Sequence, residues 1–206
     1  KEKWIQTQLS SVGPIIAQHI DESTGMYLSL NHATTGADYR FQPLWDFDDK
    51  HNPANALNDS RKFVETQLIK RGIPTDDLIP FASGRKGIHI ASRSLLLPRD
   101  DWYAVFNHAT LNHWSQEFPT LDGGIYQNRA LIRAPFSRHP KSASTRKKTI
   151  PWDLFWRGSF KDIQTWAQEP LTDMQWAEME SLVIESLPNN GQMPAYWIPF
   201  SEGLVL

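Results

Sequence analysis

The sequence contains no cysteine among its 206 residues. Disulfide bonds and zinc sites built on thiolates are therefore excluded. The chain must fold on its hydrophobic core alone, and a hydrophobic content of 40% is enough for that. Because a chain without cysteine suits a reducing compartment, we expect a cytoplasmic protein.

Long apolar runs are also missing. No segment of the sequence reaches the roughly 18 apolar residues that a membrane-spanning helix needs. The beginning of the chain, from Lys1 to Gln8, carries charge where a secretory signal would be apolar. The sequence therefore predicts a protein that does not interact with a membrane.

Acidic residues are absent from one stretch, residues 123–152, although the whole chain has a net charge of −2. This stretch holds seven basic residues, which are Arg129, Arg133, Arg138, Lys141, Arg146, Lys147 and Lys148. A basic segment in an otherwise acidic protein favours a local site for a polyanion, such as nucleotide phosphates or a template backbone. Residues 146–148 fit contacts with template phosphates or a solvated loop equally well.

Strand-like and helix-like patterns alternate along the chain, without internal repeats or long linkers. We expect strands at residues 25–30 and 125–132, and a hairpin formed by residues 78–82 and 88–91. Helices are expected from Pro53 to Gly72, over residues 98–116, and after the capping box at Thr172. The predicted class is α/β of the α+β kind, with mostly antiparallel pairing, in one domain covering residues 1–206. The abrupt beginning and the apolar end suggest a fragment of a longer protein.

The first motif that can carry chemistry is Trp45-Asp-Phe-Asp48. On a strand, Asp46 and Asp48 share one face. Two carboxylates this close repel each other unless a cation lies between them, and Mg²⁺ or Mn²⁺ takes oxygen ligands of this kind. The alternative is a strand end with two solvated acids.

The second motif lies in the turn of the predicted hairpin, Ser83-Gly-Arg-Lys-Gly-Ile-His89. Its glycines allow the backbone to approach an anion closely. Four side chains can donate hydrogen bonds to phosphate oxygens: Ser83, Arg85, Lys86 and His89. The alternatives are a surface hairpin with a basic tip and, for His89, a half-buried strand histidine.

The third motif begins at Leu121-Asp122 and continues in Arg133-Ala-Pro-Phe-Ser-Arg-His-Pro-Lys141. Four side chains of the second part offer donors suited to a polyphosphate: Arg133, Ser137, His139 and Lys141. Asp122 by itself indicates little, and the basic run alone also fits a solvated loop.

Taken in this order, the three motifs resemble those of the archaeo-eukaryotic primases, whose small subunit is catalytic. That family has Asp-hydrophobic-Asp, then Ser-Gly-Arg-Arg-Gly-hydrophobic-His, then hydrophobic-Asp followed by a Pro-Phe-Ser-x-His-Pro-Lys run. The second motif differs here only at Lys86, which stands where the family has arginine. The matches span Trp45 to Lys141, slightly under half of the chain.

The resemblance implies an α/β lobe beside a lobe like an RNA-recognition motif, with the active site in the cleft between them. It assigns two Mg²⁺ or Mn²⁺ ions to Asp46, Asp48 and Asp122, and the phosphates of a nucleoside triphosphate to the eight donors named above in the second and third motifs. The implied activity is nucleotidyl transfer that starts or extends primers on a single-stranded DNA template. Such chemistry depends on positioning and charge neutralisation around an in-line displacement.

The chain departs from the family in one respect. Cellular small subunits usually carry a cysteine-rich zinc element between the second and third motifs. Here that interval contains only His108 and His113 as candidate ligands, and two histidines five residues apart on a helix suit zinc poorly. We therefore predict no structural zinc, and a primase-polymerase of a phage, plasmid or other mobile element, assisted by a fused or separate helicase or accessory domain.

Two other classes of function compete with this prediction. One is a noncatalytic replication initiator or single-strand-binding module that retains the fold. The other is a different metal enzyme, such as a glycosyltransferase with an Asp-x-Asp motif or a nuclease. The three carboxylates argue against the first class, and the second and third motifs have no place in the other.

Overall fold

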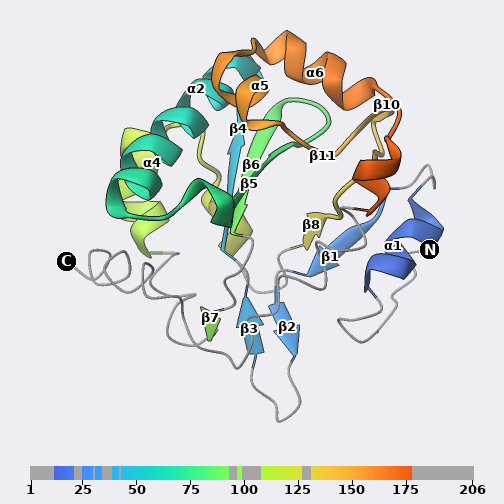
Figure 1. Ribbon diagram of the computed structural model, residues 1–206. Coiled ribbons are helices and arrows are strands. Elements are labelled where there is room, and N and C mark those ends of the chain that lie inside the picture. Colours follow the sequence, from blue (N-terminus) through green and yellow to red (C-terminus); the bar gives the residue numbers. More distant parts are fainter. Residues whose placement is uncertain are drawn as a thin grey trace.

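The computed structural model describes residues 12–20, 25–29, 31–33, 39–41, 43–92, 97–98, 108–126 and 131–177 (Figure 1). Strands and helices are mixed, and every strand pairing within these ranges is antiparallel. The predicted mixed α/β class with antiparallel pairing is thereby confirmed.

The centre of the fold is a four-stranded sheet with the order β11-β5-β6-β4. These strands are β11 (Lys148–Thr149), β5 (Leu78–Ala82), β6 (Gly87–Ser92) and β4 (Leu44–Asp48). Strands β5 and β6 form the predicted hairpin. The register places His89 opposite both Asp46 and Phe81, so these three residues share one face of the sheet.

Helices cover the other face of this sheet. Helix α2 (Pro53–Phe63) begins at the predicted proline, continues as a π-helical turn η2 (Val64–Leu68) and a 3₁₀ turn η3 (Ile69–Arg71), and ends at Gly72, whose φ is 95°. Figure 1 shows α2 and α4 (Ser115–Glu117) together on one side of β4, with α5 (Trp152–Arg157) and α6 (Phe160–Gln168) near the end of the sheet where β4 finishes. Turn η5 (Thr110–Trp114) leads into α4.

The largest hydrophobic cluster lies between the sheet and these helices, and Phe63 is at its centre. Phe63 is fully buried and its ring contacts four other aromatic rings at centroid distances of 5.1 to 5.4 Å. These rings belong to Trp45, Phe47, Trp114 and Phe118. The aromatic residues of β4 thus face the helices, which leaves its aspartates on the opposite face.

The opposite face is covered in part by a two-stranded sheet of β1 (Tyr27–Ser29) and β8 (Leu131–Arg133), close to α1 (Val12–His19) (Figure 1). A smaller hydrophobic cluster lies beneath it: Leu44, Ile79, Phe81, Ala91 and Ile132. Strands β9 (Arg138–His139) and β10 (Ser142–Arg146) form a further pair that follows β8 in the chain. A three-stranded sheet of β2 (Asn31–Ala33), β3 (Tyr39–Phe41) and β7 (Leu97–Pro98), together with the 3₁₀ turns η4 (Thr75–Asp77) and η6 (Gly123–Tyr126), completes the described elements.

The predicted strand over residues 125–132 is wrong in its first part. Residues 123–126 form η6, and only Leu131–Arg133 is a strand. The backbone N–H of Gly124 donates to Asp122 Oδ1 at 2.7 Å, and this local bond favours a turn over an extended strand. Residues 127–130 lie outside the described residues.

Two predicted helices are described only in part. Of the helix expected at residues 98–116, Pro98 belongs instead to strand β7, where it pairs with Arg40, and residues 99–107 lie outside the described residues. From residue 108 through α4 the described portion is helical, as predicted. The last helix begins after Thr172, whose hydroxyl accepts a hydrogen bond from the Gln175 N–H at 3.3 Å while the Gln175 side chain accepts one from the Thr172 N–H at 3.0 Å. This reciprocal pair is a capping box. Residues 178–206 lie outside the described residues.

Within the described ranges, none of the helices has both the length and the apolar character that a membrane crossing requires.

Candidate active site

Asp46 and Asp48 lie on the same face of β4, as their spacing predicts. Both are partly exposed, whereas Trp45 and Phe47 between and beside them are completely buried. This alternation follows from the two-residue period of a strand with one face in the core. The two carboxylates therefore point away from the helices and toward the side of the sheet that carries His89.

Asp122 is brought to this place by a short pairing along the outer edge of β4. Leu121 forms an isolated antiparallel bridge with Phe47. The Asp122 N–H donates to the Asp46 carbonyl at 2.7 Å, and the Asp48 N–H donates to the Thr120 carbonyl at 2.7 Å. Because residues opposite each other in such a pairing share a face, Asp122 lies beside Asp46 on the face that also carries Asp48.

Helix α2 anchors the segment that carries Asp122. Oδ2 of Asp59 accepts hydrogen bonds from the Thr120 N–H at 3.2 Å and from its hydroxyl at 2.9 Å. Neither Asp59 nor Thr120 was expected from the sequence to support the site. A pairing between segments this far apart in the chain leaves no local pattern that would reveal them.

Each of the three carboxylates has a protein partner. Oδ1 of Asp46 lies 3.2 Å from His89 Nε2, Oδ2 of Asp48 pairs with Lys86 Nζ, and Asp122 accepts from Gly124. Burial opposes ionisation of Asp46, but His89 and the charges of Lys147 and Lys86 outweigh it and hold the pKa of that carboxyl below its usual value. Burial lowers the pKa of His89 more than the Asp46 charge raises it, so His89 is a neutral donor to Asp46.

The carboxylates suit a divalent cation in their chemistry. Mg²⁺ and Mn²⁺ prefer carboxylate oxygens, and Oδ1 of Asp48 is buried without a hydrogen-bond partner among the described residues. Within those residues, however, no three side chains of the ligand-forming types converge closely enough to hold a metal ion as they stand. To bind one, Asp46 and Asp48 would have to exchange His89 and Lys86 for the cation.

The turn of the β5–β6 hairpin is built so that it lies against β4. Gly84 has a φ of 88°, which a glycine adopts easily. A Cβ atom on Gly87 would lie 2.6 Å from the Phe47 carbonyl oxygen, so no larger residue fits there without a shift of the backbone. The Ser83 hydroxyl accepts a hydrogen bond from the Gly87 N–H at 3.0 Å. Backbone geometry therefore explains why glycine stands at positions 84 and 87, whether or not an anion binds there.

The basic segment that begins at Arg133, the last residue of β8, contacts this hairpin. Arg133 Nη1 donates a hydrogen bond to the Ser83 carbonyl, which joins the second and third motifs directly. Arg85 and Lys141 are exposed, and Lys86 is half-buried. Ser137 is buried and its hydroxyl donates to the Ala134 carbonyl at 2.8 Å, so this predicted phosphate donor is engaged in its own turn.

His139 lies among these basic side chains. Burial and then the charges of Arg133, Arg85, Lys141 and Lys86 lower the pKa of His139 to about 4. The Lys141 N–H donates to His139 Nδ1 at 3.0 Å, so the proton of the neutral ring is on Nε2. His139 can therefore donate one hydrogen bond to an anion at pH 7 without being charged.

We expect the His139 imidazole to stay neutral in the folded protein from pH 8 down to about pH 5. Its folded pKa is lower than that of the unfolded chain, so the unfolded state binds more protons between about pH 6.5 and pH 4. The contribution of His139 to stability is then lost as the pH falls through this window. An NMR titration of the histidine side chains measures this. A measured His139 pKa near 6.5 would show that burial and the neighbouring positive charges do not lower it.

The burial of Lys147 and Lys148 contradicts both interpretations of residues 146–148, contact with template phosphates and a solvated loop. Both side chains are buried, with exposed fractions of 2% and 0%, so neither belongs to a solvated loop or is accessible to template phosphates. Lys148 faces the helices, whereas Lys147 lies on the face of the sheet that carries Asp46 and Phe81. Side chains alternate between the two faces of a strand. Neighbouring lysines at the start of a strand could therefore have been predicted to point to opposite faces of the sheet.

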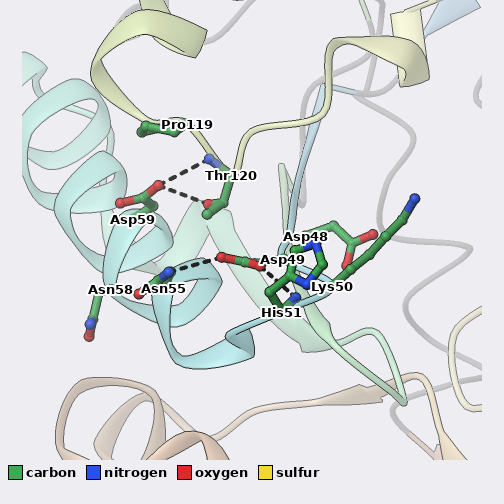
Figure 2. Close-up of a pocket in the computed structure, with 9 residues that line it drawn as sticks. All are labelled: Asp48, Asp49, Lys50, His51, Asn55, Asn58, Asp59, Pro119 and Thr120. Carbon is green, nitrogen blue, oxygen red and sulfur yellow. Dashed lines mark hydrogen bonds between the residues drawn. The ribbon is translucent and has the colours of Figure 1, made fainter.

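A polar pocket of about 590 Å³ opens beside Asp48 (Figure 2). Its walls come from the end of β4, the beginning of α2 and the segment before Asp122. Asp49 holds the beginning of α2 by accepting from the N–H groups of His51 and Asn52 and from the Asn55 side chain, at 2.8 to 3.0 Å. The lining residues are Asp48, Asp49, Lys50, His51, Asn55, Asn58, Asp59, Pro119 and Thr120. Of the three predicted metal ligands, Asp48 therefore borders this pocket, and Asp46 and Asp122 do not line it.

The fold resembles that of a solved structure, the polymerase domain from Mycobacterium tuberculosis ligase D in complex with DNA. The TM-score is 0.51 and the sequence identity is 14%, and the alignment covers 87% of this chain and 64% of that chain. At this identity the likeness concerns the fold alone, and the present chain spans less than two thirds of the other. No family model matches the sequence, and no curated protein matches it.

Proposed function

We propose that this chain is a nucleotidyltransferase that starts or extends primers on single-stranded DNA from nucleoside triphosphates. The observation that carries the proposal is the pairing of residues 120–122 with β4, which gathers Asp46, Asp48 and Asp122 on one face. The same face meets the hairpin turn and the basic run through the Arg133 bond to Ser83. Enzymes that transfer nucleotidyl or phosphoryl groups place metal-binding carboxylates next to basic side chains that bind the phosphates.

The basic side chains supply the phosphate side of the proposed reaction. Exposed Arg85 and Lys141 attract the triphosphate, and Arg133 and the Nε2–H of His139 orient it. The partly buried setting strengthens these interactions relative to bulk water. Their charge stabilises the pyrophosphate as it leaves, and Ser83 and Ser137 hold the two loops in place rather than contacting the phosphates.

The three aspartates supply the metal side. Asp46, Asp48 and Asp122 would hold two Mg²⁺ or Mn²⁺ ions, which when bound lower the pKa of the attacking hydroxyl and neutralise the phosphates. Lys86 forms an ion pair with Asp48, and its side chain would turn toward the triphosphate once a cation binds that carboxylate. The polar pocket beside Asp48 offers a path for the primer end that carries the hydroxyl.

The likeness to a polymerase domain bound to DNA supports this activity at the level of the fold. We assign residues 1–206 to one primase-polymerase domain with a lobe like an RNA-recognition motif beside the central sheet, and we propose a single-stranded template and a primer as partners. A helicase or accessory domain, fused or separate, would supply the remaining functions of a longer protein.

Replacing His89 with alanine is expected to raise the apparent KM for the nucleotide by roughly 10 to 100-fold. Hydrogen bonds to charged groups contribute about 1.5 to 3 kcal/mol, and His89, which pairs with Asp46 here, would donate to the phosphates once a cation takes its place on that carboxylate. Steady-state incorporation kinetics at several nucleotide concentrations measure this effect. His113→Ala, an exposed histidine on the helical side, is the matched control, and unchanged kinetics in His89→Ala would remove His89 from the site.

One observation favours a different function. The Lys86–Asp48 ion pair neutralises a carboxylate that the catalytic proposal needs, as expected of a noncatalytic single-strand-binding module. A primer-synthesis assay decides between the two: purified protein, unprimed single-stranded DNA, labelled NTPs or dNTPs, and Mg²⁺ or Mn²⁺. Metal-dependent products support catalysis. DNA binding without synthesis, and without extension of a supplied primer, supports the noncatalytic module.

A further inference from the structure

Lys147 is a buried cation on the same face as the proposed site. Its side chain is 2% exposed, its Nζ donates to the Arg133 carbonyl at 2.9 Å, and it lies 4.9 Å from the centre of the Phe81 ring. Phe81 is paired with His89, which is bonded to Asp46. Lys147 therefore stands between the carboxylates and the basic run.

The backbone of Lys147 also fixes the turn that carries the phosphate donors. Its N–H donates to the Ser137 carbonyl at 3.0 Å, and its carbonyl accepts from the Phe136 N–H at 2.5 Å. Phe136 has a φ of 62°, a conformation that a bulky residue rarely adopts and that the surrounding bonds must maintain. Three hydrogen bonds from one residue thus hold the segment from Arg133 to Ser137.

The charge of Lys147 has no matching anion within the part of the chain that the structure describes. Among the described residues no carboxylate forms an ion pair with it, although Asp46 is near enough to lower the cost of its charge. Burial and the neighbouring Arg133 charge lower the pKa of Lys147 to about 7. A buried ammonium is costly, and an apolar side chain would fill the same space more favourably unless an anion binds nearby.

Lys148, the next residue, shows what a purely structural buried lysine does in this fold. Its Nζ donates to the carbonyls of Trp166, Glu169 and Pro170 at 3.1 to 3.4 Å and lies 4.0 Å from the centre of the Trp166 ring. These carbonyls lie at the end of α6, where a cation is favourable. The two lysines are equally buried and point to opposite faces of the sheet.

We propose that Lys147 is a positioning residue of the nucleotide site, which holds Arg133 toward the triphosphate and adds a buried positive charge behind it. The inference rests on the proposed function, because the triphosphate is the anion that this charge would serve. It also explains why a lysine, and not an apolar residue, occupies a buried position beside Phe81.

The test compares Lys147→Met with Lys148→Met, a matched pair of neighbouring buried lysines. For each variant we would measure the Kd of a nonhydrolysable nucleoside triphosphate, the Kd of inorganic tripolyphosphate, the KM and kcat of incorporation, and the Tm. Lys147→Met is expected to raise both Kd values and the KM by about tenfold or more with a smaller change in kcat. Lys148→Met is expected to lower the Tm and leave the Kd values unchanged.

A chemical rescue separates charge from packing. The chain has no cysteine, so Lys147→Cys can be alkylated in denaturant to an aminoethyl side chain that mimics lysine, and then refolded. Triphosphate affinity should return on alkylation. If Lys147→Met does not fold, Lys147→Gln, which keeps a donor for the Arg133 carbonyl but no charge, takes its place in the comparison.

The outcomes distinguish this inference from the function on which it rests. Wild-type protein that neither binds the triphosphate nor incorporates nucleotides would refute the proposed function itself. Active wild-type protein together with a folded Lys147→Met variant whose Kd and KM stay within about twofold would overturn the role of Lys147 alone. A variant that loses only Tm, as Lys148→Met should, would overturn it as well.

Discussion

Replacing Asp46 and Asp48 together with asparagine is expected to abolish nucleotide incorporation, with a loss of about 1,000-fold or more. Removing even one preorganised group that stabilises charge in a transition state costs about 100 to 1,000-fold, and this change removes two carboxylates of the proposed metal site. Asparagine keeps the size of each side chain, so Trp45 and Phe47 should remain packed in the core. Primer synthesis and primer extension, each with Mg²⁺ and with Mn²⁺, measure the effect.

The matched control is Asp153→Asn on α5, an exposed aspartate that pairs with Arg157 at 3.1 Å, far from the carboxylates of β4 in the chain. It should retain full activity. Circular dichroism and thermal unfolding establish that the double variant is folded. A folded double variant that incorporates nucleotides at a rate within about twofold of the wild type would remove the metal assignment from β4.

Replacing Phe63 with alanine should cost about 3 to 5 kcal/mol of the free energy of unfolding. Phe63 is fully buried, and its ring contacts Trp45 and Phe47 of β4 and two aromatic residues of the segment before Asp122. The substitution leaves a cavity at the point where α2 meets the strand that carries the aspartates. Because natural domains are stable by only about 5 to 15 kcal/mol, such a loss is a large fraction of the total.

Urea denaturation followed by tryptophan fluorescence measures this loss. Phe63→Leu should cost less because it removes less volume. Met174→Ala should change stability by no more than about 0.5 kcal/mol, since Met174 is 80% exposed. A Phe63→Ala variant as stable as Met174→Ala would show that the aromatic cluster does not support the site.

The elements that follow from short-range patterns could be predicted from the sequence. Proline at the first position and glycine after the last fixed the limits of the helical segment from Pro53 to Arg71, and two runs of apolar residues around Ser83-Gly-Arg-Lys-Gly predicted the hairpin. The two-residue period of a strand placed Asp46 and Asp48 on one face. Each of these rests on interactions within a few residues.

The prediction of a strand over residues 125–132 was wrong in its first part, because the hydrogen bond from the Gly124 N–H to the Asp122 side chain favours a turn there. The burial of Lys147 and Lys148 was missed for another reason. Charge by itself suggests solvent exposure, whereas both ammonium groups are buried and donate to backbone carbonyls of other segments. Their partners are set by tertiary packing, which composition does not reveal.

The sequence by itself determined the residue types of the site, the strand and hairpin that carry most of them, and the absence of cysteine chemistry. Only the tertiary structure decided which residues meet. It paired residues 120–122 with β4, joined Arg133 to Ser83, and directed Lys147 and Lys148 to opposite faces of one sheet. The physical reason is that side-chain periodicity is local, while hydrogen bonds between distant strands depend on how the whole core packs.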